Sequence, residues 1–397
     1  MVGFGLFLLI KGRTQSSVQT LDVVSWNITW FGSNSQYPPD DNLQESNTRK
    51  ILKYLNADLY GLTEIVDTSR LRKLADSLGS NFGWVVSPFC SGNTTGVGSS
   101  WLQGQKLAFI FNKNIFTNVK TRGLMRNSAQ AYYNFASGRF PFMLTADVTL
   151  NGSTKTMNFI LLHGKAGSSI SDYERRREAT KELKDTLDVY FSNSSNIILG
   201  DFNDALNTTI CSSCGTALSS YDILIKDSTD ADHYVSITLP LGKAGQTSMT
   251  DYPNVVDNHV ISNEVAPGYV MNSASIRTDV VPLVVQYAAT TSDHYPVFSQ
   301  YNLNGILTGI FSPALPDIKI NIFPNPFTDQ IIFVPAKNLN GVKIWVEDIM
   351  GRRLSILEEK RITANTKFLL DLSKLSKGVY LIRIESKEGS SVHKIIK

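Results

Sequence analysis

The feature that most constrains the fold is a series of short apolar runs, each of which borders polar residues. Runs typical of β-strands occupy residues 21–26, 107–111, 142–148, 157–162, 196–199 and 255–261. Helical patterns lie between them, and in the longest, residues 172–191, apolar side chains recur every three or four positions. Strands and helices alternate too irregularly for repeated βαβ units, so an α/β sandwich is predicted.

Length and composition exclude several classes of protein. The chain has 397 residues, 42% hydrophobic and 18% charged, which is too long for one ordinary domain and too apolar for a disordered chain. Beyond the first ten positions no run of about 18 apolar residues occurs, so the mature chain is expected to have no transmembrane segment. The formal charge is only +3, so nucleic-acid binding would depend on local basic residues.

The composition and periodicity of the sequence change along the chain and predict its domains. Residues 2–10 are apolar, as in a signal segment, although an apolar N-terminus that is not cleaved is the alternative. Residues 302–316 lack periodicity and contain glycine, serine and proline, which is typical of a linker. Six or seven short strands follow, separated by turn residues, and predict a small antiparallel β-sandwich. We therefore assign a signal segment (1–20), a main domain (21–302), a linker (303–317) and a C-terminal domain (318–397).

Three cysteines are too few for a disulfide-rich scaffold. Cys211 and Cys214 are separated by two serines, and no second pair completes a zinc ribbon. In an exported chain this pair is expected to form a loop disulfide, and a reduced pair is the alternative.

Polar residues at the ends of the predicted strands are the candidate cation ligands and catalytic residues. Carboxylates, amides and histidines border six strands, in the order Asn27, Glu64, His163, residues 200–203 (Gly-Asp-Phe-Asn), Asp257 and residues 292–294 (Ser-Asp-His). Oxygen ligands of this kind suit a hard cation such as Mg²⁺ or Ca²⁺. A cation, a histidine paired with a carboxylate, and further hydrogen-bond donors are what phosphodiester hydrolysis requires.

This ordered set resembles the endonuclease/exonuclease/phosphatase superfamily over residues 21–301. The resemblance implies a four-layered α/β sandwich of the deoxyribonuclease I type. It also implies a divalent cation, which would be Mg²⁺, Ca²⁺ or Mn²⁺. We expect the activity to be endonucleolytic hydrolysis of DNA, or of RNA, by a monomeric enzyme.

Roles for individual residues follow from the same resemblance. The metal ligands are expected to be Asn27, Glu64, Asp201 and Asp293. The catalytic residues are expected to be His163, Asp201, Asn203, Asp257 and His294, with His294 as the general base supported by Asp257. Arg139 and Asn203 are expected to contact the substrate phosphate, whereas His233 and His259 match no position of the motif.

One position departs from the deoxyribonuclease I pattern. Where that subfamily has a carboxylate supporting the first histidine, this chain has Gln105. A neutral amide can orient His163 but cannot raise its pKa as a carboxylate would, which weakens the case for His163 as a proton donor.

The C-terminal domain is similar to the sorting domain of the type IX secretion system of Bacteroidetes. The resemblance rests on residues 322–327 (Ile-Phe-Pro-Asn-Pro-Phe), residues 346–352 and the terminal residues 394–397. It implies secretion, or attachment to the outer-membrane surface, with the type IX machinery as a partner. A carbohydrate-binding sandwich is the alternative, but Trp345 is the one tryptophan of this domain, and no aromatic row accompanies it.

Two other functions remain open at this stage. One keeps the hydrolytic chemistry but takes sphingomyelin or a sugar phosphate as substrate. The other is a surface adhesin that retains the fold without activity. The set of intact polar residues favours an enzyme.

Overall fold

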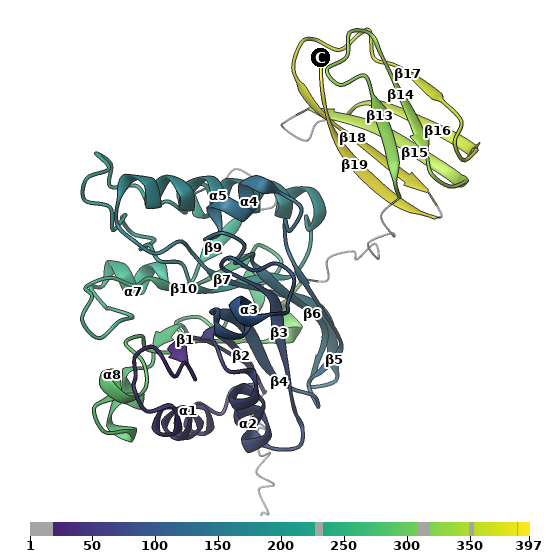
Figure 1. Cartoon of the computed structure of the whole chain (residues 1–397). Helices are drawn as coiled ribbons and strands as arrows, with labels where there is room; N and C mark the ends of the chain where they lie inside the picture. Colours follow the sequence, from purple (N-terminus) through teal and green to yellow (C-terminus); the bar gives the residue numbers. More distant parts are fainter. Residues whose placement is uncertain (1–18, 227–232, 308–317, 349–352, 387) are drawn as a thin grey trace, which may run out of the picture. The chain divides into compact units, whose positions relative to one another are not determined.

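The computed structural model describes residues 19–226, 233–307, 318–348, 353–386 and 388–397. The chain divides into two compact units, residues 1–310 and 311–397 (Figure 1). Nearly all of the predicted signal segment and most of the predicted linker lie outside the described residues.

The first unit is built on two six-stranded sheets. One has the order β11-β12-β1-β2-β4-β3 and contains β1 (Leu21–Phe31), β2 (Leu59–Ile65), β3 (Phe82–Cys90), β4 (Lys106–Asn112), β11 (Ser275–Ile276) and β12 (Val297–Tyr301). The other has the order β5-β6-β7-β8-β10-β9 and contains β5 (Phe116–Gly123), β6 (Phe142–Leu150), β7 (Ser153–His163), β8 (Asn196–Asp201), β9 (Tyr234–Ser236) and β10 (Asp257–Ser262). The pairs β1–β2 and β7–β8 are parallel, so within each pair the carboxyl ends lie together.

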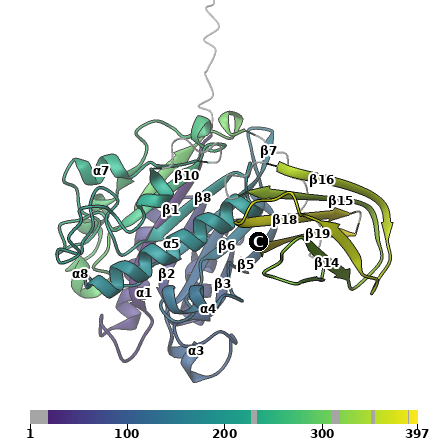
Figure 2. The ribbon, with the colours of Figure 1, turned by 90° about the horizontal axis from the view of Figure 1, so that it is seen from above.

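Helices cover the outer faces of both sheets. Figure 1 shows α1 (Asp41–Leu55) and α2 (Thr68–Leu78) below the sheets, and α4 (Ala129–Asn134) and α5 (Ile170–Tyr190) above them; Figure 2 shows α5 running across the sheet that it covers. The shorter helices are α3 (Ser99–Gln103), α6 (Asp222–Ile225), α7 (Leu239–Lys243), α8 (Tyr287–Thr290), η1 (Ala266–Gly268), η2 (Thr278–Leu283) and η3 (Leu303–Gly305).

Side-chain caps fix where the long helices begin. Asp40 and Asp67 each accept two backbone N–H bonds at the start of α1 and α2, and Ser169 accepts one at the start of α5. These bonds satisfy N–H groups that have no partner inside the helix.

Three hydrophobic clusters define the layers of the first unit. One lies between the sheets and includes Leu59, Phe109, Phe159 and Leu199. The second joins α5 to the outer face of one sheet, and the third joins α1 and α2 to the outer face of the other. The predicted four-layered α/β sandwich is confirmed.

The first residues of the predicted linker pack against the first unit. Leu303 and Ile306 are almost fully buried in the cluster between the sheets. Residues 303–306 therefore belong to the packed first unit, because two apolar side chains in this polar stretch reach its core.

The second unit is a small antiparallel sandwich. Its three-stranded sheet has the order β13-β14-β17, and its four-stranded sheet has the order β16-β15-β18-β19. The strands are β13 (Ile320–Phe323), β14 (Gln330–Pro335), β15 (Leu339–Asp348), β16 (Arg353–Ile362), β17 (Phe368–Asp371), β18 (Val379–Ser386) and β19 (Gly389–Ile396). Buried side chains of both sheets form one core. Among the described helices, none has the length and apolar character needed to span a membrane.

Candidate active site

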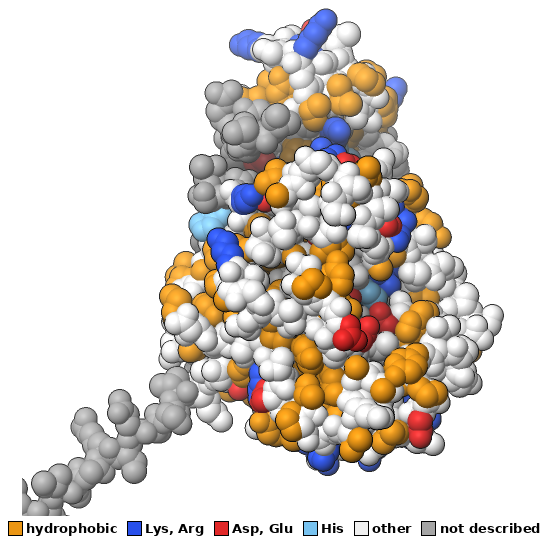
Figure 3. Space-filling view, turned by 90° about the vertical axis from the view of Figure 1, so that its left-hand side faces the viewer, with side chains coloured by type: hydrophobic (Ala, Val, Ile, Leu, Met, Phe, Trp, Pro, Cys, Tyr) orange, Lys and Arg blue, Asp and Glu red, His pale blue; other side chains and the backbone are white. Residues whose placement is uncertain are grey.

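The fold brings the predicted polar residues to one edge of the two sheets. Asn27 and Glu64 lie in β1 and β2, while His163 and Asp201 are the last residues of β7 and β8. Asp257 is the first residue of β10 and the register partner of Asp201. Figure 3 shows acidic side chains gathered beside a histidine in a hollow of the surface.

Asn27 connects carboxylates of the two sheets. Its Nδ2 donates to Glu64 Oε1 at 3.1 Å and to Asp201 Oδ2 at 3.0 Å, and it lies 3.5 Å from Nε2 of His294. Nε2 of His163 lies 3.5 Å from Asp201 Oδ2 and 3.7 Å from Glu64 Oε1. Glu64 is half-buried and the other four side chains are buried. These five residues form a single polar cluster.

His294 and Asp257 form a buried hydrogen-bonded pair. His294 Nδ1 lies 2.8 Å from Asp257 Oδ2, which leaves Nε2 facing the polar cluster. Burial alone would lower the pKa of His294, but the charge and hydrogen bond of Asp257, with the charges of Asp201 and Asp293, raise it to about 10. Burial and the nearby charge of Asp257 likewise raise the pKa of Asp201. The hydrogen bond fixes the orientation of the imidazole, as a general base requires.

Burial disfavours the charged form of His163. Burial and the positive charges of Arg139 and His294 lower its pKa well below the usual value. Its Nδ1 is buried without a hydrogen-bond partner within the described part of the chain. Oε1 of Gln105 accepts a bond from Nη1 of Arg139 at 3.1 Å, so this amide oxygen bonds Arg139 rather than His163.

Arg139 is a buried residue rather than an exposed phosphate contact. Its Nε donates to the His163 carbonyl at 3.0 Å, and its Nη2 donates to the Gly164 carbonyl at 2.7 Å. Only 5% of the residue is exposed. The structure therefore does not support direct phosphate contact by Arg139, and the guanidinium instead holds the end of β7 in place.

Asn203 lies against Asp201. The backbone N–H of Asn203 donates to Asp201 Oδ1 at 2.8 Å, and its Nδ2 donates to Asp201 Oδ2 at 3.1 Å. Asn203 and Glu64 have φ values of 52° and 63°, a left-handed conformation that is uncommon outside glycine. Backbone strain of this kind is frequent at functional positions.

Asp293 lies at the rim of the cluster. Its side chain is 48% exposed, and Oδ1 lies 3.9 Å from Nε2 of His294. The hydroxyl of Thr29 donates to the same Oδ1. Asp293 is therefore the most accessible carboxylate among the predicted site residues.

The remaining histidines of the first unit lie elsewhere. His259 is buried between the sheets, where its ring nitrogens lie 2.8 Å from Ser299 Oγ and 3.0 Å from Ser25 Oγ. His233 precedes β9, and its carbonyl accepts a bond from Asn263 N–H. Neither histidine reaches the polar cluster, in agreement with the sequence analysis.

Three supporting residues had no assigned role in the sequence. Ser248 Oγ donates to Asp257 Oδ2 at 2.7 Å, and the Tyr287 hydroxyl donates to the His294 carbonyl at 2.6 Å. Ser292 Oγ donates to the Asn27 carbonyl and accepts from His294 N–H. Ser292 could have been found from the sequence, because it belongs to the Ser-Asp-His motif. Ser248 could not, because a single serine in a loop is common and belongs to no motif.

The donor set fits a divalent cation. Asn27, Glu64 and Asp201 offer oxygen ligands of the kind that Mg²⁺, Ca²⁺ and Mn²⁺ accept. Asn27 Oδ1 is buried without a partner within the described residues, so this amide oxygen has no protein donor. Ligand atoms of Asp201, Asp257 and His294 also lie within 4.8 Å of one another. Asp257 Oδ2 already bonds the imidazole of His294, whereas Asn27 Oδ1 has no partner among the described residues, so Asn27, Glu64 and Asp201 are the better candidate ligands.

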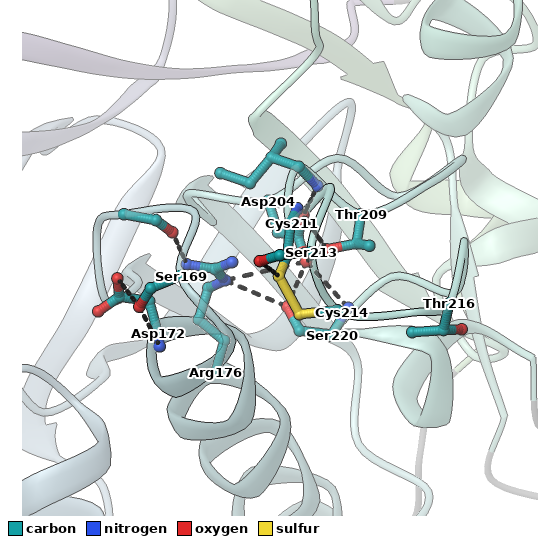
Figure 4. Close-up of a disulfide and its surroundings, with 12 residues drawn as sticks. Ser169, Asp172, Arg176, Asp204, Thr209, Cys211, Ser213, Cys214, Thr216 and Ser220 are labelled. Carbon is teal, nitrogen blue, oxygen red and sulfur yellow. Dashed lines mark hydrogen bonds and ion pairs between the residues drawn. A yellow bond between two sulfur atoms is a disulfide. The ribbon is translucent and has the colours of Figure 1, made fainter.

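Cys211 and Cys214 form a disulfide, one of the two alternatives that the sequence left open (Figure 4). The bond closes a turn in the loop that follows Asn203. The third cysteine, Cys90, is free and buried.

Comparisons with solved structures and with family models give the following similarities. The structure is similar to an endonuclease/exonuclease/phosphatase from Beutenbergia cavernae, with a TM-score of 0.50 and 12% identity over 95% of this chain and 100% of that one. It is also similar to a protein of the same description from Bacteroides vulgatus (TM-score 0.49, 13% identity, 72% of this chain and 99% of that one). A third similar structure is the human Nocturnin catalytic domain (TM-score 0.49, 14% identity, 71% and 94%). A comparison with curated protein sequences finds no match.

Residues 321–397 match the family model described as a secretion system C-terminal sorting domain. The predicted sorting domain is thereby confirmed, and it indicates a protein that is secreted or held at the cell surface of a Bacteroidetes-type bacterium. The chain thus combines the fold of the endonuclease/exonuclease/phosphatase proteins with a C-terminal sorting domain of the type IX secretion system.

Proposed function

We propose that the first unit is a metal-dependent phosphodiesterase that hydrolyses DNA, or RNA, outside the cell. The observation that carries the proposal is the buried His294–Asp257 pair, whose free Nε2 faces the cluster of Asn27, Glu64 and Asp201. A paired imidazole beside oxygen ligands for a cation is an arrangement suited to activating water for attack on a phosphate.

The residues divide into three roles. His294 takes a proton from water, and Asp257 holds the ring and stabilises its charged form. Asn203 is held against Asp201, and its longer bond from Nδ2 to the Gly164 carbonyl, 3.3 Å, would be exchanged for a bond to a phosphate oxygen as negative charge develops there. His163 has a low pKa, so we propose that it stabilises the transition state as a neutral hydrogen-bond donor rather than as an acid.

Asn27, Glu64 and Asp201 would hold the cation, with Asp293 at the rim as a further carboxylate. When bound, a divalent cation supplies positive charge that offsets the phosphate and the surrounding carboxylates, and so lowers the pKa of His294 toward the range of a working base. One chain supplies all of these residues, and we therefore propose that the enzyme acts as a monomer.

A smaller substrate is the second candidate. In the part of the chain that the structure describes, two basic side chains next to His163 are already engaged: Arg139 donates to backbone carbonyls, and Lys165 is paired with Asp172 at 2.8 Å. Nucleic-acid binding depends strongly on contacts between Lys or Arg and phosphate. The engagement of these two side chains favours a sugar phosphate or the headgroup of sphingomyelin.

A substrate panel separates the candidates. Purified protein is incubated with supercoiled plasmid, single-stranded RNA, sphingomyelin micelles and sugar phosphates, with Mg²⁺, Ca²⁺ or Mn²⁺ and with EDTA controls. Nicked plasmid that depends on the metal is the expected result. Release of phosphocholine or inorganic phosphate with the plasmid intact would show that the substrate is sphingomyelin or a sugar phosphate. The absence of hydrolysis with every substrate would contradict both candidates.

A further inference from the structure

The loop that follows the Gly-Asp-Phe-Asn motif is tied together by one buried carboxylate. Asp204 is fully buried and accepts hydrogen bonds from Ile210 N–H at 2.7 Å, from Ser220 N–H at 2.9 Å and from Ser220 Oγ at 2.6 Å. Thr209 Oγ1 donates to it as well, at 3.2 Å. Since Asp204 follows Asn203 directly, this carboxylate fixes both ends of the loop to the residue next to the site.

Arg176 of α5 extends this attachment to a second segment. Its Nε lies 3.8 Å from Asp204 Oδ2 and donates to Ser220 Oγ at 3.3 Å. Its Nη1 donates to the carbonyls of Lys165 and Gly167, both at 2.7 Å. Figure 4 shows Arg176 reaching from α5 toward Asp204 and Ser220. One guanidinium thus joins the segment that follows His163 to the segment that follows Asp201.

The two segments also touch each other beside the site. Gly164 N–H donates to the Asp201 carbonyl at 2.8 Å, and Asn203 Nδ2 donates to the Gly164 carbonyl at 3.3 Å. A Cβ at position 164 would collide with the carbonyl of Phe202 and the hydroxyl of Tyr221. The Tyr221 hydroxyl donates to that same carbonyl at 2.7 Å. A shift of either segment would therefore displace the side chain of Asn203.

Stability alone is a weak reason for a buried ion pair, because desolvating two charges offsets much of their attraction. Here Nη2 of Arg176 is also buried with no hydrogen-bond partner within the described part of the chain. The disulfide between Cys211 and Cys214 closes a short ring in the same loop, one residue after Ile210. We propose that Asp204 and Arg176 are positioning residues, which hold Asn203 and the segment after His163 in register for the phosphoester hydrolysis proposed above, on which this inference rests.

The test compares Asp204→Asn, Arg176→Met and Arg176→Lys in the full chain. Misplacing a catalytic group by about 1 Å costs about 100-fold in rate, so Asp204→Asn and Arg176→Met are expected to lower kcat about 100-fold. KM and the Mn²⁺ dissociation constant should change less than about threefold, because neither residue touches Asn27 or Glu64. Arg176→Lys is expected to recover part of the loss.

Asp188→Asn is the matched control, since Asp188 pairs with the buried Lys184 on the same helix at 2.7 Å. It is expected to alter the melting temperature without lowering kcat. Wild-type kcat in folded Asp204→Asn, or an equal loss of kcat in Asp188→Asn, would overturn the proposal. If Asp204→Asn does not fold, the two Arg176 variants decide, and equal kcat in Lys and Met would overturn it.

Amide hydrogen exchange gives a readout that needs no turnover. Asp204→Asn is expected to speed exchange of the Gly164 amide at least tenfold while the amide of Val260, in the middle of β10, is unchanged. Unchanged exchange at Gly164 would overturn the positioning role. If the wild-type protein hydrolyses no phosphoester but the Gly164 amide still exchanges faster in Asp204→Asn, the proposed function is wrong, whereas Asp204 still holds the segment that contains Gly164.

Discussion

Nδ2 of Asn27 lies 3.0 Å from Oδ2 of Asp201, a hydrogen bond that joins the two sheets at the edge where the candidate site lies. Glu64 accepts a second bond from the same nitrogen. Donors and acceptors from three strands thus meet at one point, and a cation held there would tie both sheets together.

Glu64→Gln is expected to weaken cation binding, because it removes a charged oxygen ligand from the cluster. Loss of a group in the outer shell of a metal site typically costs about 10–100-fold in affinity, so the loss here is expected to exceed tenfold. Titration with Mn²⁺ followed by electron paramagnetic resonance measures it. Glu178→Gln, on the exposed face of α5, is the control, and equal affinity in both variants would remove Glu64 from the ligand set.

His259 makes the stability of the first unit depend on pH. Burial lowers the pKa of His259 to about 3, whereas an unfolded chain takes up this proton near pH 6.5. Neutral His259 therefore makes its full contribution to the free energy of unfolding above about pH 6.5. This contribution falls by about 1.4 kcal/mol for each pH unit between 6.5 and 3, which is about 2 kcal/mol at pH 5. The free energy of unfolding, measured with urea, should fall less between pH 7 and pH 5 in His259→Gln than in wild type. An equal fall in the two proteins would show that His259 is not the source of this pH dependence.

The disulfide is expected to stabilise its own loop and to add little to the free energy of unfolding of the whole first unit. Stabilisation by a disulfide grows with the length of the closed loop, and for a ring of this size it is about 2 kcal/mol or less. Cys211→Ser with Cys214→Ser should lower the free energy of unfolding by no more than that, measured with urea under oxidising conditions. A loss of more than about 4 kcal/mol would show that the loop depends on this bond for folding.

The sorting domain is expected to control location. In a host with a type IX system, a chain ending at residue 310 should remain within the cell envelope, while the full chain reaches the medium or the cell surface. Immunoblots of fractionated cells measure this, with a periplasmic protein as a control for lysis. Equal export of both chains would contradict the assigned role.

Much of the first unit was predictable because its signals are local. Apolar runs and helical periods were sufficient for an α/β sandwich, the resemblance to the superfamily implied its four layers, and the ordered motif located Asn27, Glu64, Asp201 and His294. The contacts of Arg139 and Gln105 were not predictable, since both depend on how the chain around α3 and α4 packs beside β7. A sequence motif names residue types at given positions but not the direction of a long side chain.

Elements with mixed patterns were missed. Residues 353–362 form β16, which pairs with β15 along most of its length. Polar and apolar residues alternate only over residues 353–356, and the following Glu-Glu-Lys-Arg breaks the alternation that indicates a strand. Pairing with the neighbouring strand decides its conformation, which is information that local sequence does not contain.

The most direct test of the account is cleavage of supercoiled plasmid by His294→Ala with Mg²⁺ present. Removing a general base costs about 10²–10⁴-fold, so we expect a loss of at least about 100-fold, with Asp257→Asn also impaired and His233→Ala at the wild-type rate. Circular dichroism establishes that each variant is folded. Wild-type cleavage by folded His294→Ala would show that the His294–Asp257 pair does not activate the attacking water.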